Sequence, residues 1–297
     1  MTSCVYSGME GKRCLITGGS SGVGKAFALG LAKMGAWVVI LCRDRSRGER
    51  VIEEIRSRSG NRNVELMCAD LSVQRSIRIF AQEFKERYGK LHVLGNIAGV
   101  ILPGRLITAE RIEKTLATDY LSHFLLTHLL LDVLKASAPS RIITVSGGRW
   151  VLEKARIHFD DLELSKRYNW MEAAKQAVLA RFIFSCELAK RLNGTGVTSN
   201  TFHPGRVRSN LPRHFPWYIR LVYGMVSPFL KEECETCLLL ACAKELEGIN
   251  GKYFVDAQPE EFTPEGYTEG VAHKLWSISE QMTGIREKAE NFLSGSQ

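Results

Sequence analysis

No stretch of the 297-residue sequence approaches the ~18–20 consecutive apolar residues that a membrane-spanning helix needs. Residues 1–8 also contain no apolar core long enough for a secretory signal peptide. The sequence has neither an internal repeat nor a low-complexity tract. We therefore expect a globular protein in the cytoplasm, either free in solution or peripheral to a membrane.

The eight cysteines lack the spacing of a disulfide framework. Three of them fall in strands that are predicted to be buried: Cys14, Cys42 and Cys68. A thiol in such a strand behaves as a small apolar group. Cys234-x-x-Cys237 lies on a predicted helix with Cys242 further along, but no second Cys/His pair is placed to complete a metal site. We expect reduced, intracellular cysteines and no metal.

Basic residues exceed acidic ones, which gives a formal net charge of +8. No continuous Lys/Arg run is interleaved with aromatic residues, so we expect no nucleic-acid partner. The densest basic cluster comprises Arg43, Arg45, Arg47 and Arg50, directly after the second predicted strand. A phosphorylated cofactor or an anionic membrane surface fits this cluster better than a nucleic acid does.

Short apolar runs alternate with helical patterns along most of the chain. Strands are expected over 14–16, 37–42, 64–68, 91–94, 141–145, 197–202 and 251–255. Helices are expected over 25–34, 48–58, 72–88 with Ser72 as N-cap, 111–134, 171–192 and 232–245, and an exposed amphipathic stretch over 270–293. This alternation predicts an α/β fold with a parallel sheet and helices on both faces. We expect one domain over residues 1–297, with an excursion at about 206–230 above the carboxyl ends of the strands.

A glycine-rich turn, residues 17–24, separates the first predicted strand from the first predicted helix. Strand, glycine turn and helix in this order are the context of a dinucleotide site. Gly18 suits a tight turn, Gly22 the close approach of a pyrophosphate, and Gly24 the packing of helix against strand. The helix N-terminus offers N–H groups and a positive dipole end to the phosphates. The alternative is an ordinary Gly-rich loop between a strand and a helix.

The second predicted strand ends in Arg43-Asp44. In a dinucleotide fold the residue at this point meets the adenosine ribose. An acid accepts a hydrogen bond from the 2′-hydroxyl of NAD, whereas an arginine accommodates the 2′-phosphate of NADP. Arg43 therefore favours NADP(H) over NAD(H), with ordinary surface charge as the alternative interpretation.

Three further motifs lie at the ends of later predicted strands: Asp70-Leu71, Asn96-x-Ala98-Gly99 and Pro204-Gly205-x-Val207. Together with the glycine turn they span most of the chain, and in this order they resemble the short-chain dehydrogenase/reductase superfamily. Finer stretches resemble its retinol-dehydrogenase-like branch: residues 42–44, 121–127, 138–141, 159–162, 187–192, 194–198 and 251–254. The resemblance implies a doubly wound, Rossmann-like sheet that binds NAD(H) or NADP(H). Members of this branch mostly use NADP(H) on retinoids and other lipophilic aldehydes or alcohols.

The resemblance also implies a set of cofactor-binding residues. These are Gly18, Ser20, Ser21, Gly22 and Val23 at the phosphates, with Gly19 and Gly24 in the same turn; Arg43 at the 2′-phosphate; Asp70 and Leu71 at the adenine; Asn96, Ala98 and Gly99 along the ribose; and Pro204, Gly205 and Val207 at the nicotinamide end. Ile97 departs from the second Asn that is usual in its turn.

The residues of the family's reaction are absent from the matching positions. That reaction uses a Tyr as general acid, a Lys four residues later, a Ser that polarises the carbonyl and an Asn that holds a relay water. When residues 187–189 are matched without gaps, Ala174 stands in place of the Tyr and Val178 in place of the Lys. Gly147 stands at the Ser position and Asp119 at the Asn position. We therefore expect a protein that has lost the standard reductase chemistry.

Substitutes for the missing groups are few. Tyr168 with Lys175 is the nearest Tyr/Lys pair, but a separation of seven residues corresponds to about two helical turns. A protonated Asp119 in an apolar pocket would be a weak acid. No catalytic residue is assigned from the sequence.

Three functions remain open at this point. The first is an NADP(H)-binding sensor, scaffold or ligand-binding protein without the standard chemistry. The second is an active NADP(H)-dependent oxidoreductase that uses substitute groups and retains proximity effects. The third keeps only the fold and binds no cofactor.

The partners are less defined than the cofactor. The excursion contains the aromatic stretch Phe215-Pro216-Trp217-Tyr218, with Arg213, His214 and Arg220 beside it. It would form a lid over a pocket for a small lipophilic ligand, dip into a membrane interface, or simply pack over the sheet. A homodimer through the two long helices, as is frequent in the family, is also compatible with the sequence.

Overall fold

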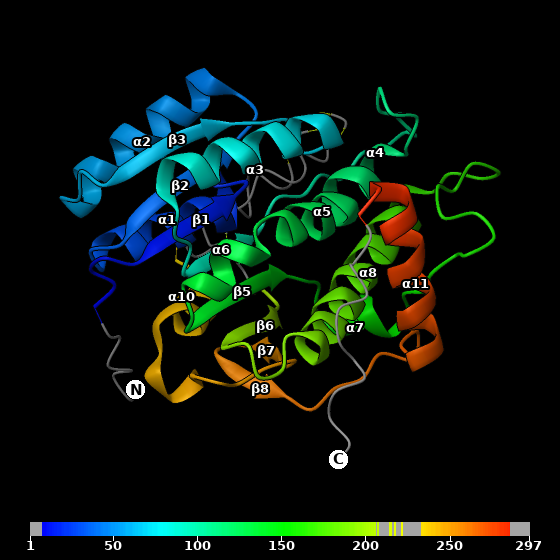
Figure 1. The fold of residues 1–297 in the computed structure, drawn as a ribbon. Coiled ribbons are helices and arrows are strands. Elements are labelled where there is room, and N and C mark those ends of the chain that lie inside the picture. Colours follow the sequence, from blue (N-terminus) through cyan, green and yellow to red (C-terminus); the bar gives the residue numbers. More distant parts are fainter. Residues whose placement is uncertain are drawn as a thin grey trace, which may run out of the picture.

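The computed structural model describes residues 8–205, 207, 214–215, 217, 221 and 233–285. Most of the excursion expected over 206–230 lies outside these residues, including Arg213, Tyr218 and Arg220. The end of the amphipathic stretch, from residue 286 onward, also lies outside them. The described residues form one layer of strands between two layers of helices (Figure 1).

Eight strands form a single sheet among the described residues. They are β1 Arg13–Thr17, β2 Trp37–Cys42, β3 Val64–Cys68, β4 Val93–Asn96, β5 Ser140–Val145, β6 Val197–Phe202, β7 Tyr253–Val255 and β8 Gln258–Glu260. The order is β3-β2-β1-β4-β5-β6-β7-β8, and every pair is parallel except β7 with β8. The predicted doubly wound, Rossmann-like parallel sheet is therefore confirmed.

The antiparallel edge strand β8 is not predicted from the sequence. Asp256 and Ala257 join β7 to β8, and both have positive φ, at 45° and 64°. A two-residue hairpin of this kind usually carries Asn-Gly or Asp-Gly. Because Asp-Ala lacks the glycine, the local sequence gives little indication of the hairpin.

Helices cover both faces of the sheet (Figure 1). One face carries α1 Gly22–Lys33, α2 Arg45–Ser59 and α10 Glu235–Cys242. The other carries α3 Gln74–Tyr88, α5 Ser122–Leu129, α8 Trp170–Arg191 and α11 Glu269–Thr283. Shorter segments are α4 Lys114–Leu116, the π-helical turn η1 Ala117–Leu121, α6 Leu131–Ala136, α7 Arg149–Glu153 and the 3-10 turn η4 Lys244–Leu246.

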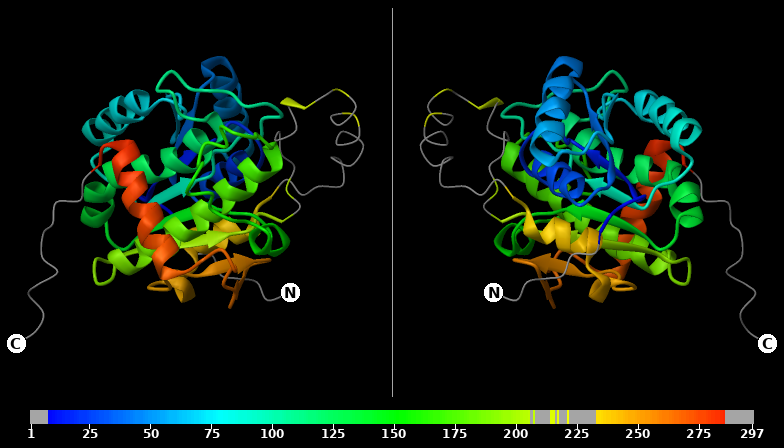
Figure 2. Two further views of the ribbon diagram at one scale, coloured as in Figure 1. Left: turned by 90° about the vertical axis from the view of Figure 1, so that its right-hand side faces the viewer. Right: turned by 90° about the vertical axis from the view of Figure 1, so that its left-hand side faces the viewer.

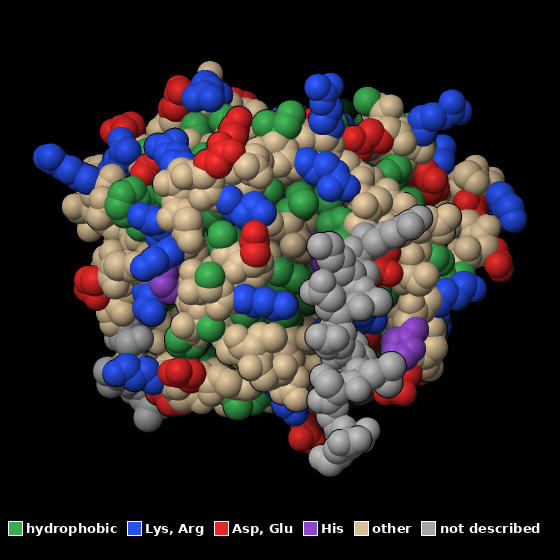
Figure 3. All heavy atoms as spheres, in the orientation of Figure 1, with side chains coloured by type: hydrophobic (Ala, Val, Ile, Leu, Met, Phe, Trp, Pro, Cys, Tyr) green, Lys and Arg blue, Asp and Glu red, His purple; other side chains and the backbone are tan. Residues whose placement is uncertain are grey.

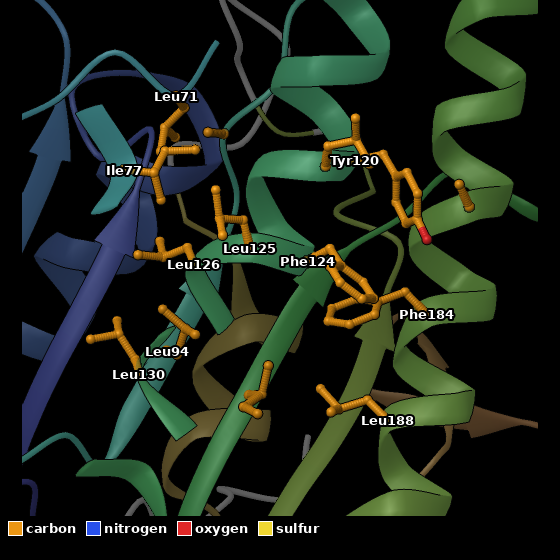
Figure 4. Close-up of a cluster of buried hydrophobic side chains, with 14 of the residues drawn as sticks. Leu71, Ile77, Leu94, Tyr120, Phe124, Leu125, Leu126, Leu130, Phe184 and Leu188 are labelled. Carbon is orange, nitrogen blue, oxygen red and sulfur yellow. The ribbon is translucent and has the colours of Figure 1, made fainter. Parts of the chain in front are cut away.

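Each face of the sheet has its own hydrophobic core. Figure 4 shows part of the larger one, where Phe124 of α5 and Phe184 of α8 meet above the strands. In the continuous apolar strand β2, Val39 faces this core and Ile40 faces the core beneath α1. A strand buried on both faces is the prediction for this run, and it is confirmed.

The long helix expected over 111–134 is broken into four segments. A short α4 leads into the π-helical turn η1, then α5, and Leu130 interrupts the helix before α6. A π turn inserts an extra residue and shifts the side chains that follow it. Asp119 lies in this turn, and its carboxylate accepts the N–H of Val100 at 2.8 Å. Apolar periodicity alone does not report such a tertiary bond.

The expected N-cap at Ser72 is wrong, because α3 begins two residues later. The Ser72 hydroxyl donates instead to Asp70, at 2.7 Å. The first N–H groups of α3, those of Gln74 and Arg75, donate to the carboxylate of Glu110, at 2.8 and 3.2 Å. A distant loop therefore caps the helix in place of the adjacent serine.

Helix α11 is not the exposed helix expected from the sequence, because one of its faces is buried. Trp276 lies against Phe124 and Phe184, with ring centroids 5.1 and 5.9 Å apart, and Ser279 is 2.7 Å from the hydroxyl of Tyr120. Figure 2 shows α11 on the same side of the molecule as α3, with α2 on the other side. The helix expected over 232–245 is shorter, at Glu235–Cys242.

The surface mixes the two signs of charge. On the face seen in Figure 3, Lys and Arg side chains lie among Asp and Glu side chains. Within the described residues, no helix is long and apolar enough to cross a bilayer, and no group of three or more His, Cys, Asp or Glu is placed to hold a metal. Cys14 and Cys42 are buried as predicted, whereas Cys68 is partly exposed.

Candidate cofactor site

The glycine turn lies between the carboxyl end of β1 and the start of α1. Gly18 has φ +66°, and a Cβ atom there would lie 2.9 Å from the Cα of Ala98. A Cβ on Gly24 would lie 2.6 Å from the carbonyl oxygen of Gly18. Both positions therefore require glycine, the first for conformation and space and the second for space. The turn is held directly against the second predicted cofactor loop, around Ala98.

The hydroxyl of Thr17 joins these two loops. It donates to the carbonyl of Gly95, at 3.1 Å, and accepts the N–H groups of Ile97 and Ala98, at 2.8 and 3.0 Å. Thr17 is fully buried. One side chain therefore satisfies three backbone groups of a loop that is distant in the sequence.

The N-terminus of α1 is arranged to receive an anion. Ser21 is its N-cap, with extended backbone, and its side chain makes no capping hydrogen bond. The first N–H groups of a helix have no intrahelical acceptor, so an uncapped terminus suits a phosphate. The first residue of the helix, Gly22, has φ +55°, which favours glycine.

The residues after β2 and β3 meet at the adjacent part of the same edge. The guanidinium of Arg43 lies 3.8 Å from the carboxylate of Asp70, and 58% of the Arg43 side chain is exposed. The carboxylate of Asp44 accepts the N–H of Arg47, at 3.0 Å, and so caps α2. Asp44 is engaged with the helix, whereas Arg43 projects toward solvent.

The predicted residues share one edge of the sheet. Arg43 follows β2, Asp70 and Leu71 follow β3, Asn96 ends β4 with Ala98 and Gly99 after it, Pro204, Gly205 and Val207 follow β6, and Gly19, Ser20, Ser21, Val23 and Gly24 lie in the turn or at the start of α1. In a doubly wound sheet, ligands bind outside the carboxyl ends of the strands. The arrangement therefore fits a dinucleotide lying across this edge.

Asn96, at the end of β4, supports this edge from the protein interior. Its side chain is fully buried and donates to the hydroxyl of Thr127 on α5, at 3.0 Å. The side chain therefore anchors the loop to the helix layer. Ala98, which is buried, and Gly99, which is partly exposed, follow it.

The positions matched to the family's Ser and Lys lie against each other. A Cβ atom on Gly147 would lie 2.7 Å from Cγ1 of Val178 and 3.3 Å from Cβ of Val151. The neighbouring hydroxyl of Ser146 is buried and donates to the carbonyl of Val178, at 3.4 Å. Aliphatic side chains therefore surround position 147.

Tyr168 and Lys175 are not brought together as an acid and its activating cation. The Tyr168 hydroxyl donates to the carbonyl of Leu102, at 3.1 Å, and Lys175 pairs with Glu172, at 2.8 Å. Burial is the main cause that raises the pKa of Tyr168, and a hydrogen bond with Thr115 and the charge of Arg105 only partly offset it. A raised pKa opposes the activation that a catalytic tyrosine needs.

One charged residue at this edge, Arg181 on α8, is not among the predicted site residues. Its side chain is buried beneath Gly99, close to Asp119 and His123. A signal is present in the sequence, because Arg181 stands between Ala180 and the apolar run Phe182-Ile183-Phe184. A lone charge within such a run is a candidate for a buried, partnered charge.

Comparison with known proteins places this geometry in a family. Residues 12–215 match the family described as short chain dehydrogenase. Retinol dehydrogenase 12 of Bos taurus is 44% identical over 279 residues, covering 93% of this chain and 87% of that protein. Retinol dehydrogenase 14 of Mus musculus is 41% identical over 293 residues, with the same coverage of 93% and 87%.

Solved structures also match the fold over most of this chain. An uncharacterised protein from Mycobacterium paratuberculosis superposes with a TM-score of 0.74 at 28% identity, covering 96% of this chain and 97% of that one. The active-site complex of Pseudomonas aeruginosa RhlG with NADP superposes with a TM-score of 0.64 at 25% identity, covering 84% and 96%.

Proposed function

We propose that this chain, which belongs to the short chain dehydrogenase family and has retinol dehydrogenases among its relatives, binds NADP(H) without carrying out the family's standard reductase chemistry. In this proposal the bound cofactor orders the carboxyl edge of the sheet, and the protein acts as a sensor, scaffold or ligand-binding protein. The cofactor itself supplies hydride chemistry when a suitable acid and substrate are present.

The close packing of Gly147 and Val178 supports the second part of the proposal, that the standard reductase chemistry is absent. Restoring only the serine would bring its Cβ to 2.7 Å from the valine methyl, so the two replacements are adapted to each other. A lysine retained at position 178 without its tyrosine would be an unpaired charge, which valine avoids. Ala174, one helical turn earlier on α8, offers no proton.

Arg43 and Asp44 support the choice of NADP(H). Asp44 already accepts a hydrogen bond as the cap of α2, so it is less available to a ribose hydroxyl. Arg43 is largely exposed and 3.8 Å from Asp70, and a 2′-phosphate would compete favourably for its guanidinium. The second structural relative, RhlG, was solved with NADP.

A calorimetric titration of NADPH and NADH tests the cofactor half of the proposal. We expect NADPH to bind more tightly, and Arg43→Ala to weaken NADPH by about tenfold or more while changing NADH little, because one charge-assisted contact is lost. Arg45→Ala, in the same basic cluster, is the matched control and should leave both affinities unchanged. If neither nucleotide binds at millimolar concentration, the cofactor proposal is refuted, and the chain shares only the fold of the family.

A second function is favoured by the relatives' names. Proteins called retinol dehydrogenases are 41% and 44% identical to this chain, so an NADP(H)-dependent oxidoreductase of retinoids or other lipophilic aldehydes is the alternative. It requires a substitute acid, for which Asp119 and Tyr168 are the candidates. Chromatographic detection of retinol formed from retinal, lost in Tyr168→Phe or in an Asp119→Ala variant that still binds NADPH, would establish this alternative.

A lipophilic partner is proposed for two exposed aromatic side chains. Trp150, next to Gly148 in space, is 68% exposed, and Trp217 is 74% exposed. Exposed tryptophans suit a membrane interface or a lipophilic ligand. Flotation with liposomes, before and after Trp217→Ser, distinguishes the membrane from a purely intramolecular role: loss of flotation in the variant supports the membrane.

A further inference from the structure

Two opposite charges lie inside the protein beneath the loop that follows β4. Asp119 of η1 is 4% exposed, and Arg181 of α8 is 6% exposed. Charged residues are almost never so buried unless they are paired. Burial lowers the pKa of Arg181, and the carboxylate of Asp119 opposes that shift. The two side chains therefore lie within electrostatic range of each other in the core.

Both charges reach the same point of the loop. A Cβ atom on Gly99 would lie 3.4 Å from Oδ2 of Asp119 and 3.8 Å from Nη1 of Arg181. The other carboxylate oxygen, Oδ1, accepts the N–H of Val100 at 2.8 Å. The carboxylate therefore holds the loop backbone directly, and the guanidinium lies beside Gly99 from the side of α8.

The other buried titratable group beside the pair, His123, does not supply a second positive charge. Burial together with the Arg181 cation lowers the pKa of His123 to about 3, so its imidazole is neutral. Nε of Arg181 has no hydrogen-bond partner among the described residues. Arg181 is therefore the cation that offsets the Asp119 carboxylate below the loop.

We propose that Arg181 and Asp119 form a buried charge pair that fixes residues 96–100 in the shape that accepts the nicotinamide ribose of NADP(H). They are positioning residues, and the proposal rests on the proposed cofactor function. Arg181 stands three residues after Val178 on α8, so a cation near the loop persists although the lysine position is aliphatic. Removing one member of such a pair leaves an uncompensated buried charge, whereas removing both does not.

The test compares NADPH with adenosine 2′,5′-bisphosphate, which lacks the nicotinamide and its ribose. In Arg181→Met we expect NADPH to bind about tenfold more weakly, with the bisphosphate changed by less than about twofold, because only the loop after β4 is released. The double variant Asp119→Asn/Arg181→Met should recover most of the NADPH affinity, because the amide oxygen of the new side chain still accepts the Val100 N–H. Arg181→Lys, which keeps the charge, should stay near wild type.

The matched control is Arg191→Met on the same helix. Arg191 pairs with buried Glu187, at 3.0 Å, and stacks over Trp276, so its loss also disturbs a buried charge. It lies away from the cofactor edge and should lower stability without changing the ratio of the two affinities.

Two results would overturn the role of the pair. The first is an equal ratio of the two affinities in wild type and Arg181→Met. If Arg181→Met does not fold, recovery of folding in the double variant still supports the coupling, and failure of both variants to fold is the second overturning result. Absence of NADPH binding in wild type would refute the proposed function instead.

Discussion

Cγ1 of Val178 lies 2.7 Å from the position that a Cβ atom on Gly147 would take. A Cβ atom this close to a methyl group is repulsive, so a larger residue at position 147 would force Val178 or the backbone to shift. The sequence matches these two residues to the positions at which the family's reaction places a serine and a lysine.

The first prediction concerns Gly147→Ser. The new Cβ must displace Val178 or the end of β5, which should cost about 1–3 kcal/mol of unfolding free energy. Urea denaturation monitored by tryptophan fluorescence measures the change.

The control for this prediction is the same substitution in a Val178→Ala background. Alanine lacks Cγ1, so Gly147→Ser should cost clearly less there than in wild type, and the difference is the coupling between the two sites. Equal costs in both backgrounds would show that the contact does not constrain position 147.

The second prediction concerns Thr17→Val. The change keeps the shape of the side chain but leaves the buried N–H of Ala98 without its acceptor and the N–H of Ile97 with only its bond to the carbonyl of Gly95, at a cost of about 1–3 kcal/mol. NADPH affinity should fall as well, because the two cofactor loops are no longer tied. Thr17→Ser retains the hydroxyl and serves as the control. Equal stability of the valine and serine variants would contradict this role of the hydroxyl.

The third prediction is a pH dependence that arises from His128. Burial lowers the pKa of His128 to about 4, whereas the unfolded chain takes up the proton near its ordinary value. The unfolded state therefore binds more protons below about pH 6.5, and stability falls as pH decreases toward 4. Between about pH 7 and pH 5, this residue should remove about 2 kcal/mol.

The variant His128→Asn isolates this contribution. Asn can donate to the carbonyl of Phe124, which lies 2.7 Å from Nδ1 of His128, but it does not titrate. The variant should lose less stability than wild type over the same pH range, as measured by urea denaturation. The same pH dependence in both proteins would refute the assignment to His128.

The sheet could be predicted from the sequence because its signals are local. Apolar runs predict β2 and β3, and the glycines predict the turn before α1. Helix α8 differs from its expected limits by about one residue at each end. These elements bury apolar side chains along most of their length, so pattern and structure agree. The order of the cofactor loops then follows from the doubly wound topology.

The remaining features depend on contacts between distant residues. Glu110 caps α3, and Thr17 binds the loop after β4. Asp119 lies in a π turn, and its carboxylate accepts the N–H of Val100. None of these contacts has a signature at fixed sequence spacing. The burial of Arg181 has one weak signal in the sequence, the apolar run 182–184 beside it, and the packing of α8 is needed to establish it.

The most direct test of the account measures binding and consumption of NADPH in one sample. The protein is titrated with NADPH until binding saturates, and the absorbance of the reduced nicotinamide is then followed after addition of retinal or a medium-chain aldehyde. We predict saturable NADPH binding and no consumption above that of a protein-free control. Consumption of NADPH in proportion to the protein would contradict this prediction, and its loss in Tyr168→Phe, or in an Asp119→Ala variant that still binds NADPH, would identify the substitute acid.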